Sequence, residues 1–124
     1  MSIRKEIKKA EEKRLEILAT LLHVKSMIRG TFGKVHRKCG KPTCKCNEGK
    51  GHLSIRISWT EESVSKTKAI SKDDEAWTIF MTSQYKQFRK ARKNLREINE
   101  QINKLINKLE EEIVIATNKE RGVM

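Results

Sequence analysis

The chain has few aromatic residues and a modest share of apolar ones. Aromatic residues make up 5% and apolar residues 36% of its 124 residues, which argues against a large globular core. The apolar residues are nevertheless regularly spaced, which argues against full disorder. This composition favours long helices packed through narrow seams, and the length is that of one domain.

Long apolar runs are also lacking. No stretch approaches the roughly 20 residues that a membrane span needs, and the N-terminus lacks the apolar centre of a signal peptide. The chain has three cysteines, all within residues 39–46, whereas a secreted disulfide framework would space them apart and pair them evenly. Clustered thiols are more typical of metal ligands in a reducing compartment. We therefore expect a cytoplasmic protein without a membrane span.

Negative charge is scarce around these cysteines. The net charge is +12, and residues 31–72 carry ten basic and three acidic side chains, a balance of +7. The balance is +4 for residues 1–30 and +1 for residues 73–124. Such a concentration of positive charge attracts polyanions, of which nucleic acid is the commonest inside cells. A solvated face that only aids solubility is the alternative.

Two segments have the apolar periodicity of amphipathic helices. In residues 2–29 the intervals alternate between four and three, with Ser2 as the N-cap and Gly30 just beyond the end. Residues 72–118 carry a heptad seam. Its a and d positions hold Met81, Phe88, Ala91, Leu95, Ile98, Ile102, Leu105 and Leu109. These lengths predict one helix of roughly 40 Å and one of roughly 65–70 Å.

Residues 31–70 follow a period of two. Leu53, Ile55, Ile57 and Trp59 alternate with polar residues, which is typical of a half-buried strand. Weaker strand patterns cover residues 31–38 and 64–70, and the polar turn 60–63 joins the last two strands as a hairpin. A three-stranded sheet this small needs support from packed helices or from a metal.

The order of these segments predicts the architecture. We expect an α+β fold in which two long antiparallel helices form a coiled-coil hairpin, with a small three-stranded β and zinc-knuckle module between them. Residues 1–124 would form a single domain. Because the second helix is longer, Ile102, Leu105, Leu109 and Ile113 would remain uncovered. Such a stripe needs a partner, so we expect a homodimer through the C-terminal helix, or else a different coiled-coil protein.

The residues with metal-binding chemistry follow the pattern Cys39-x4-Cys44-x-Cys46-x5-His52. Zinc favours four thiolate or imidazole ligands in a tetrahedron, and the glycines and proline between these residues suit a tightly folded loop. We expect Cys39, Cys44, Cys46 and His52 to bind Zn²⁺, with His36 competing for the fourth position. The spacing is not a standard finger pattern. Thiols packed as small apolar side chains, or thiols with a redox role, remain alternatives.

The stretch Arg37-Lys-Cys-Gly-Lys-Pro-Thr-Cys-Lys-Cys46, followed by Gly49 and Gly51-His52, resembles the core of a known family. This is a family of small uncharacterised prokaryotic and phage proteins. Its core runs Arg-x-Cys-Gly-Lys-Pro-x-Cys-x-Cys, then a Gly-rich link, then His-Gly-Pro and an aromatic strand, with helices on either side. The chain departs from this pattern after His52, where Leu53-Ser54-Ile55 replaces Gly-Pro-aromatic. The resemblance supports the module and implies no function for it.

Basic side chains form two candidate nucleic-acid-binding surfaces, because lysine and arginine neutralise phosphates. The first comprises Lys34, Arg37, Lys38, Lys41, Lys45, Lys50 and Arg56. The second, on the C-terminal helix, comprises Lys86, Arg89, Lys90, Arg92, Lys93 and Arg96. Trp59 and Tyr85 could stack on bases, but both lie in apolar patterns that favour a core position.

No catalytic constellation is recognisable. The acidic residues lie mostly on helix surfaces without a matching base, and no phosphate-cradling glycine loop is present. We therefore expect a protein that is not an enzyme. The pattern favours a basic zinc-knuckle accessory or regulatory protein that binds DNA or RNA and is dimeric through a coiled coil. The alternative is an adaptor that binds an acidic protein partner with its coiled coil and basic face, without nucleic acid.

Overall fold

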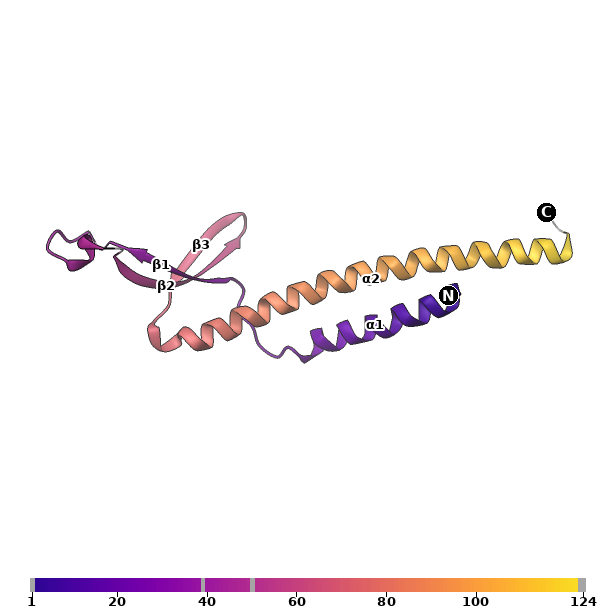
Figure 1. Cartoon of the computed structure of the whole chain (residues 1–124), viewed down its shortest axis with the longest axis horizontal. Helices are drawn as coiled ribbons and strands as arrows, with labels where there is room; N and C mark the ends of the chain where they lie inside the picture. Colours follow the sequence, from indigo (N-terminus) through magenta and orange to yellow (C-terminus); the bar gives the residue numbers. More distant parts are fainter. Residues whose placement is uncertain (1, 39, 50, 123–124) are drawn as a thin grey trace. The chain divides into compact units, whose positions relative to one another are not determined.

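The computed structural model describes residues 2–38, 40–49 and 51–122, without the side chains of Cys46 and Asn47. The elements follow one another along the chain as labelled in Figure 1. They are helix α1 (Ile3–His23), strand β1 (Thr31–Arg37), the short 3-10 helix η1 (Lys45–Glu48), strands β2 (His52–Glu61) and β3 (Val64–Ala69), the 3-10 helix η2 (Lys72–Asp74) and helix α2 (Glu75–Arg121). The chain divides into two compact units, one of Met1–Val24 with Phe88–Met124 and one of Lys25–Gln87.

This arrangement corrects the predicted fold class. The structure has one N-terminal helix of 21 residues, a three-stranded antiparallel sheet and one long C-terminal helix of 47 residues. The prediction of two long antiparallel helices with a β module between them is therefore wrong. Helix α1 ends at His23 because Val24 is extended, with φ −71° and ψ 117°. The Ile28 N–H then donates a hydrogen bond to the Met81 carbonyl, 3.2 Å away, so a tertiary contact replaces the last predicted helical turns.

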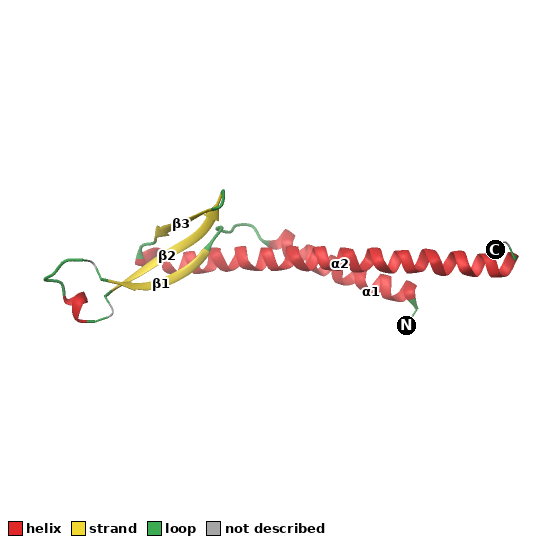
Figure 2. Ribbon diagram, turned by 90° about the horizontal axis from the view of Figure 1, so that it is seen from above, coloured by secondary structure: helices red, strands yellow, loops and turns green. Residues whose placement is uncertain are grey.

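Helix α1 packs against the part of α2 that follows Phe88 (Figures 1 and 2). The buried centre of this contact is formed by Ala10, Ile98 and Leu105. Partly buried residues surround it: Ile7, Ile17, Leu95 and Ile102. The heptad seam of α2 is thus buried here. Ile102 and Leu105 were expected to be uncovered. Both instead belong to the contact with α1, in which Leu105 is buried and Ile102 is partly buried.

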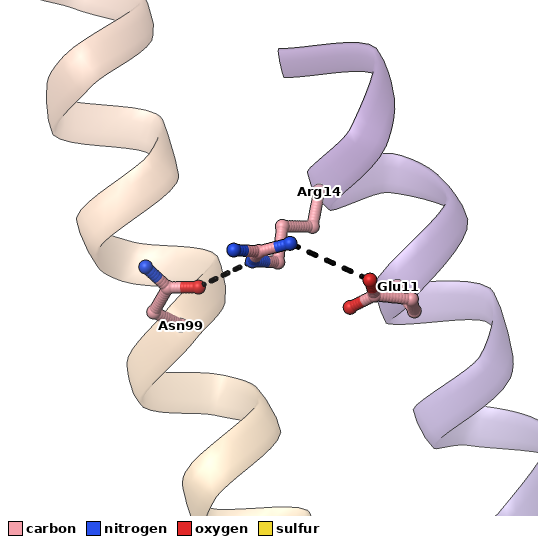
Figure 3. Close-up of polar contacts among 3 residues, drawn as sticks. All are labelled: Glu11, Arg14 and Asn99. Carbon is pink, nitrogen blue, oxygen red and sulfur yellow. Dashed lines mark hydrogen bonds and ion pairs between the residues drawn. The ribbon is translucent and has the colours of Figure 1, made fainter. Parts of the chain in front are cut away.

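A polar contact also joins α1 to α2 in this unit. Arg14 lies among the apolar positions of α1, and its Nε donates a hydrogen bond to Oδ1 of Asn99, 2.9 Å away (Figure 3). Its Nη1 lies 3.4 Å from Oε1 of Glu11, one helical turn earlier. The guanidinium therefore has polar partners on both helices, which explains why the apolar seam tolerates it.

The sheet has the strand order β1-β2-β3, and both pairs are antiparallel. Glu62 and Ser63 connect β2 to β3, and both have positive φ, 50° and 66°. A two-residue loop of this kind matches the right-handed twist of the two strands. Figure 2 shows the strands side by side, with the loop of residues 38–51 at the end shared by β1 and β2.

The register divides the sheet residues between two faces, because directly paired residues share a face and successive residues alternate. The inner face holds Phe32, Lys34, His36, Leu53, Ile55, Ile57, Trp59, Glu61, Val64, Lys66 and Lys68. The outer face holds Thr31, Gly33, Val35, Arg37, His52, Ser54, Arg56, Ser58, Thr60, Ser65, Thr67 and Ala69. The period of two predicted for residues 53–60 is confirmed, and Ile55 and Ile57 are buried.

The first turns of α2 lie on the inner face. Nζ of Lys34 forms an ion pair with Oε1 of Glu75 at 2.7 Å, and Trp77 and Thr78 line a common pocket with Ile57 and other residues of this face. The inner face is therefore covered around Ile55 and Ile57, whereas Leu53 and Val64 of the same face remain exposed. Within the ranges that the structure describes, no helix combines the length and apolarity needed to cross a membrane.

Candidate metal and nucleic-acid site

The loop of residues 38–51 is closed at its base by Gly51. This residue has φ +92°, and a Cβ atom there would overlap the carbonyl group of Arg37 and lie 2.7 Å from the Lys38 nitrogen. Only glycine fits without a shift of the backbone. The next residue, His52, pairs with Arg37 at the end of the β1–β2 ladder. The end of the sheet therefore fixes the position of His52.

A turn sets the position of Cys44. Its N–H donates a hydrogen bond to the carbonyl of Lys41, 3.2 Å away, and Pro42 occupies the second turn position, where its fixed φ is favourable. Helix η1 begins directly afterwards, at Lys45. As a result, Sγ of Cys44 lies 3.2 Å from Nε2 of His52.

This separation suits two ligands of one metal ion. From Zn–S and Zn–N bonds of about 2.3 and 2.0–2.1 Å at a tetrahedral angle, the two ligand atoms should lie roughly 3.5 Å apart. The observed 3.2 Å is close to that value. Cys44 is a free, half-buried thiol and His52 is exposed. Their donor atoms and spacing therefore fit zinc, for which thiolate and imidazole are preferred ligands.

The remaining predicted ligands are Cys39 and Cys46, with His36 as the competitor of His52. Cys39 lies outside the described residues, and so does the side chain of Cys46. Among the residues whose side chains are described, no group of three or more His, Cys, Asp or Glu is assembled as a metal site. His36 pairs with Leu53 on the inner face, whereas His52 lies on the outer face. The imidazole beside Cys44 is thus that of His52, and His36 points to the opposite side of the sheet.

The basic residues predicted around the cysteines are separated by the sheet. Arg37 and Arg56 lie on the outer face, whereas Lys34 lies on the inner face in its ion pair with Glu75. Three further predicted residues are exposed in the loop: Lys38, Lys41 and Lys45. Lys50 lies outside the described residues. The predicted surface therefore loses Lys34 and keeps a group on the outer face and the adjoining loop.

The outer face is polar and carries no carboxylate on any residue of its three strands. Its charged side chains are Arg37 and Arg56, and Arg37 pairs with His52. Hydroxyl groups supply most of its other polar atoms, from Thr31, Ser54, Ser58, Thr60, Ser65 and Thr67. Arginine and hydroxyl side chains are donors that commonly contact phosphate oxygens. An anion on this face would meet no opposing charge from the strands.

The second predicted surface lies on α2. Its six members are exposed: Lys86, Arg89, Lys90, Arg92, Lys93 and Arg96. Lys86, Lys90 and Lys93 follow one another at intervals of four and three, so they share one side of the helix. Tyr85, considered for stacking on bases, is half-buried. This stretch is a run of positive charge on a regular helix, without a second element shown to complete a site.

Sequence reasoning missed a pocket on the inner face. Trp59, expected in a core, is half-buried and lines this pocket together with Arg29, Trp77 and Thr78. A signal was present in the sequence: Asp74, Trp77 and Thr78 are spaced i, i+3, i+4 and so share one helix side. Asp74 and Trp77 continue the heptad frame before Met81, whereas the predicted apolar seam begins only at Met81.

The fold and site define a small α+β protein with a supporting helix, an acid-free outer sheet face and a thiol–imidazole pair at the base of its loop. The chain belongs to the family described as a domain of unknown function, DUF6788, which matches residues 4–78. The match spans α1, the loop and the whole sheet, and it ends in the first turn of α2. No curated protein and no solved structure matches the chain. The expectation of an uncharacterised family is confirmed at this level.

Proposed function

We propose that this protein binds nucleic acid, as an accessory or regulatory factor, through the outer face of its sheet and the loop of residues 38–51. The observation that carries the proposal is the composition of the outer face, where two arginines and a set of hydroxyl groups occur without a carboxylate. Polyanions gain most from such a surface, since each phosphate contact also releases condensed counterions.

The spacing of the two arginines suits a nucleic-acid backbone. Arg56 on β2 pairs with Gly33 on β1, and Arg37 lies four residues after Gly33 on β1. At about 3.3 Å per residue along β1 and about 4.8 Å between the strands, the two positions are separated by roughly 14 Å. One strand of a duplex rises about 3.4 Å per nucleotide along the helix axis. Along that axis, the separation of the two arginines corresponds to about four nucleotides. The hydroxyl groups between and beyond them can accept or donate hydrogen bonds at intervening sugar and phosphate positions.

Zinc has a structural role in this proposal. Cys39, Cys44, Cys46 and His52 would hold the ion, and the observed Cys44–His52 separation supports two of these four ligands. The bound ion would supply a fixed cross-link between the loop and the start of β2. The loop lysines, Lys38, Lys41 and Lys45, would then be held beside the outer face.

We also propose that two copies pair through α2. Apolar residues remain exposed towards its C-terminal end: Ile106, Ile113, Val114 and Ile115. Ile106, half-buried Leu109 and Ile113 are separated by three and four residues, the spacing of a coiled-coil seam. A dimer would present two outer faces to one nucleic acid, which raises affinity through effective concentration. Replacement of Ile113 by Glu should then shift sedimentation towards the monomer.

The same exposed stretch favours a second candidate function. A helix with unpaired isoleucines is also a docking surface for another protein, and the basic outer face would then meet an acidic partner. In that adaptor, nucleic acid has no part. A single stoichiometric protein partner that co-purifies with the chain and resists nuclease treatment would support the adaptor.

The test of nucleic-acid binding is a salt titration with zinc-loaded protein against single- and double-stranded DNA and RNA. We expect the logarithm of the association constant to fall linearly with the logarithm of the salt concentration. A triple charge reversal at Lys38, Lys41 and Lys45 should weaken binding to every sequence alike. Failure to bind any of these nucleic acids at low salt would refute the proposal.

A further inference from the structure

The unit Lys25–Gln87 contains a pocket of about 590 Å³ between the inner face of the sheet, the segment before β1 and the first turns of α2. Small-molecule sites usually have volumes of about 300–1,000 Å³, mostly apolar walls and a few placed polar groups. Apolar side chains dominate here as well. Its polar lining residues are Arg29, Glu61, Lys68, Ser71, Asp74 and Thr78, which include two basic and two acidic side chains.

Thr78 is the unusual member of this pocket. The residue is 0% exposed, and its hydroxyl oxygen has no hydrogen-bond partner among the described residues. The hydroxyl of Thr82, one turn later, donates to the Thr78 carbonyl at 2.9 Å, as helical threonines often do. A buried hydroxyl without a partner costs free energy, and such a group in a folded protein calls for an explanation. A molecule bound in the pocket would supply one if the side chains that cover Thr78 moved aside on binding.

The two tryptophans of the chain both line this pocket. Trp77 is 56% exposed, a large solvent exposure for an indole ring that could otherwise bury its apolar faces. The indole N–H of Trp59 donates a hydrogen bond to Oε2 of Glu61, 3.3 Å away. Lys66 donates to the same oxygen at 3.1 Å. The Lys66 ammonium and the Trp59 N–H lower the pKa of the Glu61 carboxyl, which keeps this acceptor charged.

The chemistry of the lining narrows the class of ligand. Indole rings stack on flat heteroaromatic rings, and a hydroxyl that both donates and accepts suits the hydrogen-bonding edge of a base. Arg29 and Lys68 can contact an anionic group joined to that ring, and Glu61 and Asp74 place two negative charges in the same lining. A nucleotide combines a flat ring, a polar edge and a phosphate.

We propose that this pocket binds the base of an unpaired nucleotide, stacked on Trp77 and Trp59 and hydrogen-bonded to the Thr78 hydroxyl, with its phosphate near Arg29 and Lys68. This inference rests on the proposed nucleic-acid binding and adds a base-binding subsite to it. The nucleotide can be free or can belong to a single strand. The outer face contacts the backbone of a strand, whereas this pocket takes one base from it.

Tryptophan fluorescence tests the proposal directly, since both indoles lie in the pocket. The full-length, zinc-loaded protein is titrated with AMP, CMP, GMP and UMP, and then with a short single strand and the same strand carrying one abasic position. We expect saturable quenching by at least one mononucleotide or by the intact strand. Weaker quenching by the abasic strand assigns the site to a nucleotide within a strand, and quenching by mononucleotides alone assigns it to free nucleotides. The absence of saturable quenching by any of them would overturn the proposal.

Paired variants separate binding from folding. Trp77→Ala should reduce affinity by about 5-fold or more, the usual effect of losing a stacking partner. Phe80→Ala is its control, since Phe80 is 55% exposed on the same helix and does not line the pocket. Thr78→Val should reduce affinity by about 3- to 10-fold and yet raise the melting temperature, because it removes the unpartnered hydroxyl. Thr82→Val, which loses a satisfied hydroxyl, should leave affinity unchanged. Equal affinities for the Trp77 and Phe80 variants would contradict the proposal.

The outcomes distinguish this inference from the proposed function. If strands bind with a steep salt dependence while the fluorescence stays constant and Trp77→Ala binds like wild type, the pocket proposal fails and the proposed function stands. If mononucleotides quench the fluorescence but no strand binds at low salt, the proposed function fails and the pocket remains a nucleotide site.

Discussion

Sγ of Cys44 lies 3.2 Å from Nε2 of His52, although eight positions separate the two residues along the chain. The turn from Lys41 to Cys44 and the compact backbone at Gly51 bring them together. This contact joins the loop to the first residue of β2, and it brings together two of the four residues proposed to bind zinc. Predictions about metal, loop and surface follow from this contact and from the register of the sheet.

Removal of either ligand should weaken zinc binding. Cys44→Ser and His52→Gln should each lower zinc affinity by at least about 10-fold, since loss of even an outer-shell partner of a metal ligand has this effect. His36→Gln is the matched control, because His36 lies on the inner face. Elemental analysis and competition with a chromophoric chelator measure the affinity. Zinc binding that depends on His36 and is indifferent to His52 would contradict the assignment.

Gly51 should be irreplaceable in the loop. Gly51→Ala places a Cβ atom against the Arg37–Lys38 peptide at a positive φ, and we expect a loss of about 1–3 kcal/mol in the free energy of unfolding. Gly49→Ala provides the comparison, because no atom beyond its chain neighbours lies within 4 Å of its added Cβ and its φ lies outside the left-handed region. Chemical denaturation of both variants measures the difference. Equal stabilities would show that the loop base is not closed at Gly51.

The two faces of the sheet should respond differently to loss of charge. Arg56→Ser removes a positive charge from the outer face and should reduce the salt slope of nucleic-acid binding by about 1. Lys34→Ser removes the same charge from the inner face, where Lys34 already pairs with Glu75, and should leave the slope nearly unchanged. Binding isotherms at several salt concentrations provide the slopes. A larger effect at Lys34 than at Arg56 would move the interface to the inner face.

Neighbouring residues on α2 should differ in their contribution to stability. Leu105 is 9% exposed in the contact with α1, whereas Ile106 is 47% exposed. Leu105→Ala should lower the free energy of unfolding by about 2–4 kcal/mol, as expected for a cavity in a packed seam. Ile106→Ala should cost under about 1 kcal/mol in the monomer. Thermal or urea denaturation at low protein concentration tests the pair, and equal losses would mean that α1 does not cover Leu105.

Local periodicity was sufficient to predict most of the secondary structure. The alternation at Leu53, Ile55 and Ile57 gave the central strand and its buried face, and the heptads from Leu95 to Leu105 gave the seam on α2. Both signals depend only on the geometry of a single element. The end of α1 could not be predicted in this way, because the hydrogen bond from Ile28 to Met81 joins residues far apart in sequence.

For the candidate site, the sequence indicated which residue types lie close together along the chain. It did not indicate how the fold arranges them. The sequence grouped Lys34 with Arg37 and Arg56 because all three are basic and close along the chain. The strand register separates Lys34 from the other two, because alternate residues face opposite sides of the sheet. The same rule selects His52 over His36 as the neighbour of Cys44. The pocket at Thr78 was missed because its walls come from three segments of the chain.

By itself, the sequence determined the types and approximate positions of the helices and strands, the concentration of positive charge near the cysteines and the grouping of three thiols within residues 39–46. These properties are local, since they depend on side-chain type and on spacing along one element. Only the tertiary structure decided where helix α1 ends, which residues share each face of the sheet, and that Cys44 lies beside His52. Those outcomes depend on pairing register and on contacts between distant segments, such as Lys34 with Glu75, which no local pattern encodes.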